Sequence, residues 1–237
     1  MTSTPRLLEA EKKICVSIMA DSTAAAISLA RQNQEVADVL EIRLDRLADP
    51  SIAPFTEALR KPLLFTNRAK WEGGHFPGDE KARVSLLIEA AQHGAAYVDI
   101  ELRTEERLRR ELIEAAPPQT GVIVSWHDFS TTPGATELSE IVSRMHGSGA
   151  AIGKLVTTPH CFQDVLRVLN LQAEAATLGL PLIAFCMGEI GMISRVATLN
   201  LGGFMTYAAP TGGQATAPGQ LPAATLRDIF RSLTHAD

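Results

Sequence analysis

The sequence predicts a (β/α)8 barrel, a fold of the α/β class. Short runs rich in β-branched residues alternate with longer helical patterns along the chain, giving eight strand-then-helix units with no element left over. Repeated units of this kind produce parallel strands with right-handed crossovers, and eight of them close into a barrel. The length of 237 residues is also close to the usual size of that fold. No linker or low-complexity tract divides the sequence, so residues 1–237 are expected to form a single domain.

The strands are expected where short apolar runs contain β-branched or aromatic residues and end at turn-forming residues. In chain order they are Ile14–Met19, Val39–Leu44, Leu63–Asn67, Tyr97–Leu102, Val122–Trp126, Ile152–Val156, Leu182–Met187 and Phe204–Tyr207.

Helical patterns occupy the intervening segments. The clearest are Ser22–Gln34, Glu80–His93, Thr104–Ala115, Thr136–His146, Phe162–Thr177 and, after the last strand, Ala223–Leu233. Ser22 and Thr104 are of the types that cap helix N-termini, and we expect them to do so here. A doubly wound open sheet is the alternative fold, but it usually has a glycine-rich first turn. The first turn here, residues 19–22, contains no glycine, which favours the barrel.

The composition excludes several classes of protein. Hydrophobic residues make up 46% of the chain and charged residues 21%, which suits a large core and not a disordered chain. The net charge of −5 argues against a nucleic-acid partner, because phosphates require a basic face. Neither a signal peptide nor a run of about 18 apolar residues is present, so a cytoplasmic protein without a membrane segment is expected. Cys15, Cys161 and Cys186 fit no zinc or disulfide spacing and are expected to be reduced core residues.

Polar side chains share one face of several strands, near the C-terminal end. Side chains alternate along a strand, so Glu41 and Arg43 oppose an apolar set, and Lys154 shares its face with two apolar residues. The helices cover the outer side of a barrel, so the apolar sets should face the helices and the polar ones the interior. Active sites of this fold lie at that same end of the strands. The sequence therefore predicts that these groups converge in one site.

Lys154 is the candidate nucleophile. A closed barrel has no edge strand for a protective lysine, although a structural ion pair with Asp99 or Glu101 remains an alternative. Nucleophilic catalysis requires a neutral amine, and removal from water favours the neutral form of an amine. His127 shares the inward face of the neighbouring strand and is the candidate proton carrier, against the alternative of a structural histidine.

Other candidates have weaker support from composition alone. Glu72 sits in what looks like an ordinary turn, and Arg195 is either a surface residue or a clamp for a carboxylate. Met187 is more typical of a core residue than of a ligand-binding wall. The glycine-rich stretch 211–219 reads as a long loop after the last strand and a candidate lid.

Seven segments in order resemble the type I 3-dehydroquinate dehydratases, over nearly the whole chain. They read EIRLD, FTNRAKWEGG, DIEL, SWHDF, IGKLV, MGEIGMISR and TAPGQ. Each segment is a weak signal alone, but seven of them in this order, at the spacing of the strands of a barrel, are highly specific. The sequence departs from the family pattern at Trp126, before the histidine, at Phe185, where a methionine is usual, and at Tyr207, where a phenylalanine is usual. The loop 211–219 is also slightly longer.

The resemblance implies a reaction and a role for each matching residue. The reaction is the dehydration of 3-dehydroquinate to 3-dehydroshikimate on the shikimate route to aromatic compounds, through a Schiff base on Lys154. His127 would be the general acid and base, oriented by Glu72, and Arg195 would hold the substrate carboxylate. The other implied substrate-binding residues are Ser17, Glu41, Arg43, Arg68, Met187, Tyr207, Thr216 and Gln220.

The resemblance also implies that no metal or diffusible cofactor is needed, that the only ligand is a small molecule and that the protein is a homodimer. Two other functions remain to be weighed. A class I aldolase would share the barrel, lysine and imine, but it usually anchors a phosphate, and no clear phosphate loop is present. A non-catalytic barrel acting as a scaffold would be free to lose Lys154, His127 and Glu72, all of which are present.

Overall fold

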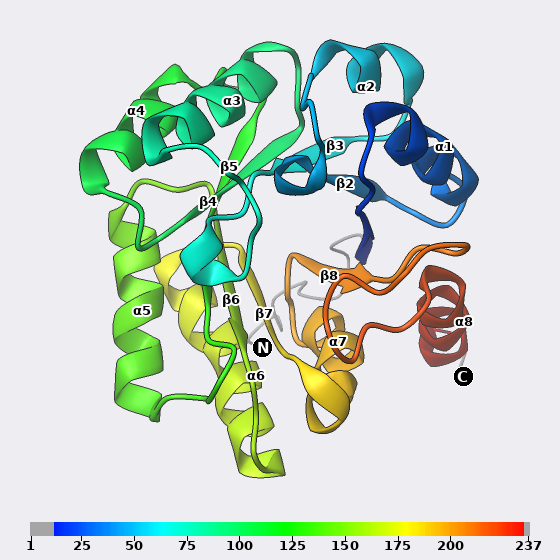
Figure 1. The fold of residues 1–237 in the computed structure, drawn as a ribbon. Helices are drawn as coiled ribbons and strands as arrows, with labels where there is room; N and C mark the ends of the chain where they lie inside the picture. Colours follow the sequence, from blue (N-terminus) through cyan, green and yellow to red (C-terminus); the bar gives the residue numbers. More distant parts are fainter. Residues whose placement is uncertain (1–11, 235–237) are drawn as a thin grey trace, which may run out of the picture.

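The computed structural model describes residues 12–234 and contains the eight predicted strands. They lie in the middle of the molecule, with helices around them (Figure 1). The strands are β1 (Lys13–Ile18), β2 (Val39–Arg43), β3 (Leu63–Thr66), β4 (Tyr97–Glu101), β5 (Gly121–His127), β6 (Ile152–Thr157), β7 (Leu182–Cys186) and β8 (Met205–Ala208). Their bounds differ from the predicted ones by at most one residue at either end.

Each strand is followed by at least one helix, as expected. The α-helices are α1 (Thr23–Asn33), α2 (Ala53–Ala58), α3 (Glu80–Gln92), α4 (Glu106–Ala115), α5 (Ala135–Gly147), α6 (Phe162–Leu178), α7 (Gly188–Asn200) and α8 (Ala223–Thr234). Two short 3-10 helices, Leu44–Arg46 and Lys70–Glu72, follow β2 and β3.

Of the two predicted caps, one is confirmed and one is wrong. The Ser22 hydroxyl accepts a hydrogen bond from the Ala25 N–H at the start of α1. Thr104 does not cap α4, whose N-cap is Glu105 with no side-chain capping bond. The Thr104 hydroxyl instead accepts a hydrogen bond from buried Arg83, which competes with the capping role.

All paired strands are parallel, and the sheet order is β7-β6-β5-β4-β3-β2-β1-β8. The barrel is nearly closed. Between β7 and β8 the described residues form no ladder, and a bond from the Phe204 N–H to the Leu182 carbonyl, 2.9 Å long, bridges the start of the gap. The order confirms the barrel and excludes the doubly wound sheet.

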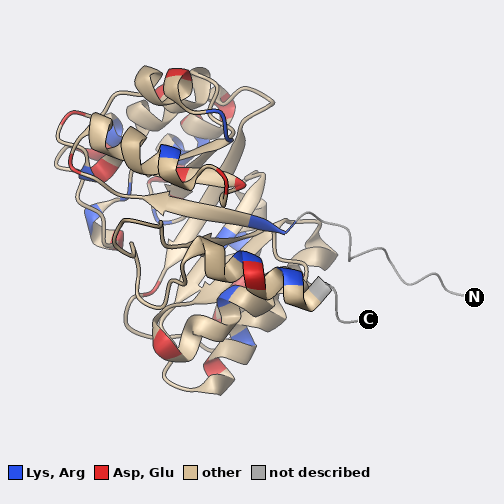
Figure 2. Cartoon of the chain, turned by 90° about the vertical axis from the view of Figure 1, so that its right-hand side faces the viewer, with Lys and Arg blue, Asp and Glu red and all other residues tan. Residues whose placement is uncertain are grey.

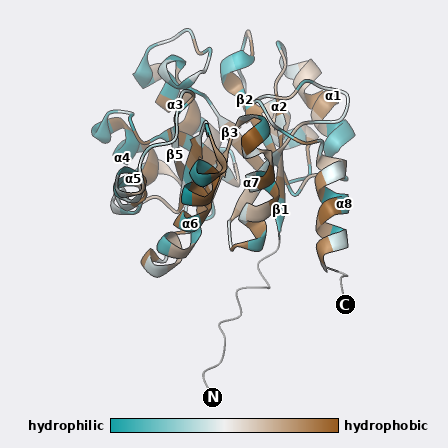
Figure 3. Cartoon of the chain, turned by 90° about the horizontal axis from the view of Figure 1, so that it is seen from below, coloured by the Kyte–Doolittle hydropathy of each residue, from teal (hydrophilic) through white to brown (hydrophobic). Residues whose placement is uncertain are grey.

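The alternation of side chains separates two apolar clusters. The outward faces of the strands pack on the helices, and Leu40, Ile42, Val98 and Ile100 belong to that cluster, as predicted. A smaller cluster fills the barrel interior. It consists of Cys15, Val39, Leu64, Ile123, Ile152, Val156, Ile183, Phe185, Met187, Met205 and Tyr207. In Figure 3 the apolar colour lies along the inner sides of the helices and the polar colour on their outer sides.

The cysteine prediction is only partly right. Cys15 and Cys186 are buried free thiols, but Cys161 is exposed. Cys161 is the N-cap of α6, and its sulfur and the Asp164 carboxylate form a capping box, which places the thiol at the helix end and not in the core. Acidic and basic residues are interspersed over the helices (Figure 2). None of the helices within residues 12–234 is long and apolar enough to cross a membrane.

Candidate active site

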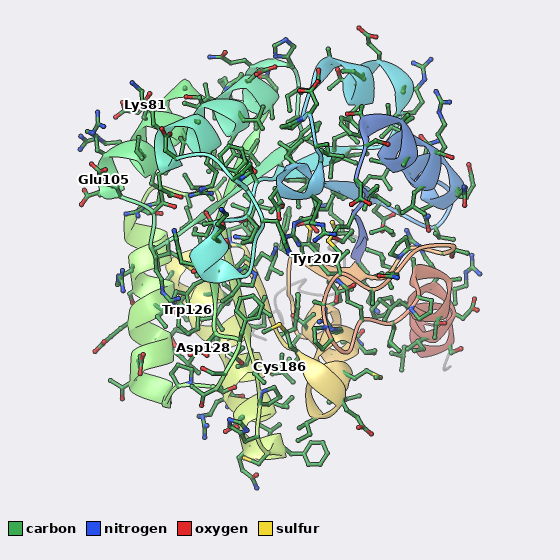
Figure 4. The ribbon with its side chains drawn as sticks, viewed as in Figure 1. Lys81, Glu105, Trp126, Asp128, Cys186 and Tyr207 are labelled. Atoms are coloured by element: carbon green, nitrogen blue, oxygen red, sulfur yellow. The ribbon has the colours of Figure 1, made fainter. Side chains whose placement is uncertain are left out.

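One pocket at the C-terminal end of the strands gathers the predicted site residues. All of them except Ser17 line it. Its lining comprises Glu41, Arg43, Arg68, Glu72, Gly73, His127, Phe129, Lys154, Val156, Phe185, Met187, Arg195, Tyr207, Thr216, Ala217 and Gln220. Tyr207 lies near the middle of the view in Figure 4, whereas Trp126 and Asp128 lie toward α5 and α6. Because parallel strands end on the same side of the barrel, residues distant in sequence meet there.

Lys154 lies in the middle of β6 and its side chain is buried. Its Nζ is 3.0 Å from Asp99 Oδ2 and 4.0 Å from Glu41 Oε1. The same nitrogen stands 4.1 Å from the centroid of the Tyr207 ring. The ion pair between Lys154 and Asp99, which the sequence left open as an alternative role for this lysine, is present. The amine is nevertheless part of the pocket wall, so the pair does not remove it from a ligand's reach.

A buried network of charges supports the base of the pocket. Arg68 donates to Asp99 and Glu101 over 2.9 Å each, and to the Ser125 hydroxyl over 2.8 Å. Arg83, reaching in from α3, is 2.6 Å from the other oxygen of Glu101. Burial alone would raise the pKa of Asp99, but the charges of Arg68 and Lys154 hold that pKa well below its ordinary value. Asp99 is therefore a fixed negative charge beside the lysine.

Glu72 and His127 form a buried pair on one side of Lys154's strand. Glu72 closes the 3-10 helix after β3, and its Oε2 is 2.9 Å from His127 Nδ1. Burial raises the pKa of Glu72 to about 8, with part of the effect offset by Arg68. Burial, followed by the charges of Arg68 and Lys154, lowers the pKa of His127 well below its ordinary value. The turn that looked ordinary in sequence thus contains a buried carboxylate whose hydrogen-bonded partner is the imidazole.

Arg195 is not a surface residue. Its side chain is 1% exposed and stacks on Phe185, with the guanidinium carbon 4.5 Å from the ring centroid. One nitrogen donates to the Pro218 carbonyl over 3.1 Å, but Nε and Nη1 have no hydrogen-bond partner. Burial lowers the pKa of Arg195 to about 10. A buried cation with unpaired donors is costly, and an anion entering the pocket would satisfy it.

The loop 211–219 lies against the pocket and against α7. The Gly188 N–H donates to the Pro218 carbonyl, and Gly219, with φ +75°, packs so closely on Gly188 that a Cβ would lie 2.3 Å from the Gly188 oxygen. Thr216 and Gln220 hydrogen-bond to each other across the loop. The loop and the residue that follows it therefore contribute two predicted residues, Thr216 and Gln220, to the pocket lining.

Ser17, Glu41 and Arg43 are placed differently from one another. Ser17 is fully buried and donates to Glu41 Oε2, so it lies outside the pocket lining and fixes the orientation of a residue within it. Thr66 donates to the other Glu41 oxygen over 2.7 Å. Arg43 is held by Asp45 through two bonds of 2.8 and 2.9 Å.

Some wall residues were not predicted. Phe129 stacks on His127 with ring centroids 5.9 Å apart, and Val156 and Phe185 supply apolar wall. Phe129 follows the histidine within SWHDF, and Val156 lies two residues after Lys154 on the same face of β6, so both signals were available in the sequence. Among the described residues, no group of three or more His, Cys, Asp or Glu side chains is arranged to hold a metal ion.

Comparisons with known proteins agree on one family. The sequence profile of the type I 3-dehydroquinases matches residues 14–237. A 3-dehydroquinate dehydratase of Desulfotalea psychrophila is 46% identical over 220 residues, covering 92% of this chain and 97% of the relative. One from Methanococcus maripaludis is 34% identical over 221 residues, covering 92% and 98%.

Solved structures agree with the sequence comparisons. The chain superposes with a TM-score of 0.87 on a type I 3-dehydroquinate dehydratase of Clostridium difficile, solved with covalently modified comenic acid. That structure is 28% identical, and the match covers 97% of this chain and 95% of the other.

Proposed function

The chain belongs to the type I 3-dehydroquinase family, and from this premise we propose which of its residues carry the reaction. The reaction is the dehydration of 3-dehydroquinate to 3-dehydroshikimate, a hydro-lyase step of the shikimate pathway of aromatic biosynthesis, and the family characteristically works through a Schiff base. The observation that carries the assignment is the convergence of Lys154, the Glu72–His127 pair and Arg195 on one pocket. The aldolase and scaffold functions weighed for the sequence are set aside on the family assignment.

Lys154 is the imine-forming residue in this proposal. The neutral amine attacks the ketone carbon, and the resulting carbinolamine loses water to give a protonated imine. Asp99, 3.0 Å from Nζ and ionised, balances the positive charge that the imine keeps. The imine withdraws electrons from the neighbouring carbon, so a proton that would be too weakly acidic next to a ketone can be removed.

His127 is the proton carrier. With Glu72 ionised, His127 Nδ1 donates its hydrogen to the carboxylate, which leaves Nε2 unprotonated to act as a base. Nε2 takes the proton next to the imine carbon, giving an enamine. It then returns a proton to the departing hydroxyl, and the electron pair of the enamine expels water. Hydrolysis of the product imine consumes one water and frees Lys154, so the net change is the loss of one water.

The remaining predicted residues are proposed to bind the substrate. Arg195 clamps the carboxylate with its unpaired donors. Glu41, Arg43 and Arg68 contact ring hydroxyls from the barrel floor.

Met187 and Tyr207 form part of the apolar wall of the pocket. Thr216 and Gln220 contact the substrate from the loop over the mouth. Ser17, predicted as a contact, is proposed to act by holding Glu41.

Turnover is tested directly by incubating the protein with 3-dehydroquinate and following the ultraviolet absorbance of the conjugated enone product. An increase that depends on protein concentration supports the proposal. Absence of product from a folded wild-type protein contradicts it.

Arg195→Ala is expected to raise KM roughly 10–100-fold, corresponding to the ~1.5–3 kcal/mol of a charge-assisted hydrogen bond. A carboxylate contact made in both ground and transition states affects KM more than kcat. Steady-state kinetics measure both, and Arg167→Ala, which removes an arginine of α6 that lies outside the pocket lining, is the matched control. An unchanged KM in Arg195→Ala would remove the clamp role.

We propose in addition that the protein is a cytoplasmic homodimer. Support comes from exposed apolar side chains near the start of α6. Phe162 is 66% exposed and Leu166, four residues on and thus on the same helix face, is 59% exposed. A second copy of the chain covering this face would bury both.

Phe162→Glu combined with Leu166→Glu is expected to convert the dimer into monomers, because each would place an unpaired charge in the interface. Sedimentation velocity measures the change. Leu201→Glu, at a leucine that is 53% exposed elsewhere, is the control and should remain dimeric. A wild type that sediments as a monomer would contradict the dimer.

A further inference from the structure

Arg103 approaches the Glu72–His127 pair from outside the pocket lining. It lies in the turn between β4 and α4, and its Nη1 is 3.7 Å from Glu72 Oε1. The other Glu72 oxygen is the one that contacts His127. Arg103 thus reaches the carboxylate from the oxygen that the catalytic pair leaves free.

Glu72 Oε1 is otherwise a buried oxygen without a hydrogen-bond partner. Burying a carboxylate oxygen without a partner favours the protonated form of the acid, since only the charged form loses strong hydration. Arg68 is a second cation near Glu72, with its Nη1 3.9 Å from Glu72 Oε2. Its shorter ion pairs are with Asp99 and Glu101. Arg103 is therefore the described cation closest to this unpartnered oxygen.

The Arg103 side chain is held in place by Trp126. Its guanidinium carbon lies 4.9 Å from the centre of the indole ring. The side chain is 43% exposed, so without a support a long arginine would sample many rotamers. Stacking on a buried tryptophan restricts those rotamers and keeps the charge directed at Glu72. Trp126 itself faces the helices. Through Arg103 it can nevertheless influence the catalytic pair inside the barrel.

We propose that Arg103, stacked on Trp126, is a positioning residue that favours the ionised form of Glu72 and so favours the His127 tautomer that accepts the substrate proton. The inference rests on the roles proposed above for Glu72 and His127.

The charges facing Glu72 act in both directions. Arg68, two residues after β3, and Arg103 favour the anion, whereas Glu101 and Asp99 on β4 oppose it. Since the pKa of Glu72 is about 8, its ionisation near neutral pH depends on this balance. Removing Arg103 takes away a positive charge and raises the pKa further. The form of the pair that accepts a proton is then reached only at higher pH, so the acid limb of the kcat/KM profile moves upward.

Arg103→Gln is expected to move the midpoint of the acid limb up by about half a pH unit, which suits a partly exposed ion pair. Below the midpoint kcat/KM falls about threefold, and on the plateau it matches wild type. Arg103→Lys keeps the charge and should return the midpoint most of the way. Arg107→Gln removes the same charge from an exposed arginine of α4 that pairs with Glu105, and should leave the profile unchanged.

A second measurement does not require turnover. The side-chain carboxylate carbon of Glu72, followed by 13C NMR in a protein labelled on glutamate, should titrate at higher pH in Arg103→Gln than in wild type. Arg107→Gln should titrate as wild type does.

Superimposable profiles of wild type and Arg103→Gln would overturn the proposal. So would an equal shift in Arg107→Gln, an unrestored midpoint in Arg103→Lys, or a loss of activity independent of pH. If the wild-type protein does not dehydrate 3-dehydroquinate, the function assignment fails, and the Glu72 titration still decides the role of Arg103.

Discussion

Treatment with 3-dehydroquinate and borohydride is expected to leave a reduced adduct on Lys154 and to inactivate the protein. Borohydride reduces an iminium to a stable amine, whereas a ketone held only by hydrogen bonds leaves no covalent label. Mass spectrometry of the intact protein gives the added mass, and peptide mapping places it. The position of Nζ in the pocket wall, beside an ionised Asp99, is the structural basis for this expectation.

Lys154→Ala should lose both the label and turnover, the latter by roughly 10⁴-fold or more, as for other residues that act covalently. Lys70→Ala is the matched control, because Lys70 is an exposed lysine of the same 3-10 helix that carries Glu72. It should label and turn over as wild type does. A full-strength label on Lys154→Ala would contradict the assignment.

His127→Ala is expected to form the imine and then stall. Loss of a general acid–base residue costs about 10²–10⁴-fold, and His127 is proposed to serve several steps, so the upper part of that range is expected. The stalled species should be visible by mass spectrometry without borohydride, as an adduct on Lys154. His160→Ala, at an exposed histidine in a loop, is the control.

The adduct on Lys154 and the turnover product, measured together in His127→Ala, distinguish two roles of His127. An adduct without turnover assigns it to the elimination. Neither adduct nor turnover would move it to imine formation, and near-wild-type turnover would refute the proton-carrier role.

Much of the barrel could be predicted because its strands obey a two-residue period. The alternation that set Glu41 apart from Leu40 and Ile42 also set Lys154 inward, and both placements are confirmed. The positions of the strand ends were enough to predict that these residues lie in one site, since the C-terminal ends of parallel strands lie on the same side of the barrel. The local pattern failed where the determining contact is distant in sequence. Thr104 looked like a helix cap, but its hydroxyl contacts Arg83, twenty-one residues earlier.

Burial of charged residues was the least predictable property. Arg195 and Glu72 each stand in segments whose composition suggests the surface, yet each is 1% exposed. Their environments are created by the loop 211–219 and by β4 and β5, which lie far along the chain. For Cys161 the error is the opposite one. It was predicted to be a core residue, but its position as the N-cap of α6 places it at the surface. No sequence pattern pointed to Arg103, since it lies in a turn after β4 and its partner Trp126 lies on β5.

The gap between β7 and β8 makes one wall of the site less rigid than the other. Lys154, His127 and Glu41 lie on strands that are joined to their neighbours by continuous ladders. Arg195, on α7, and Tyr207, on β8, flank the place where residues 12–234 form no ladder. Widening the barrel there breaks few backbone bonds, so this wall is the more compliant one, and its amides should exchange hydrogen with solvent fastest among the strands. The end of the substrate that is proposed to bind Arg195 would therefore meet an adjustable wall, while the ketone would meet a rigid one.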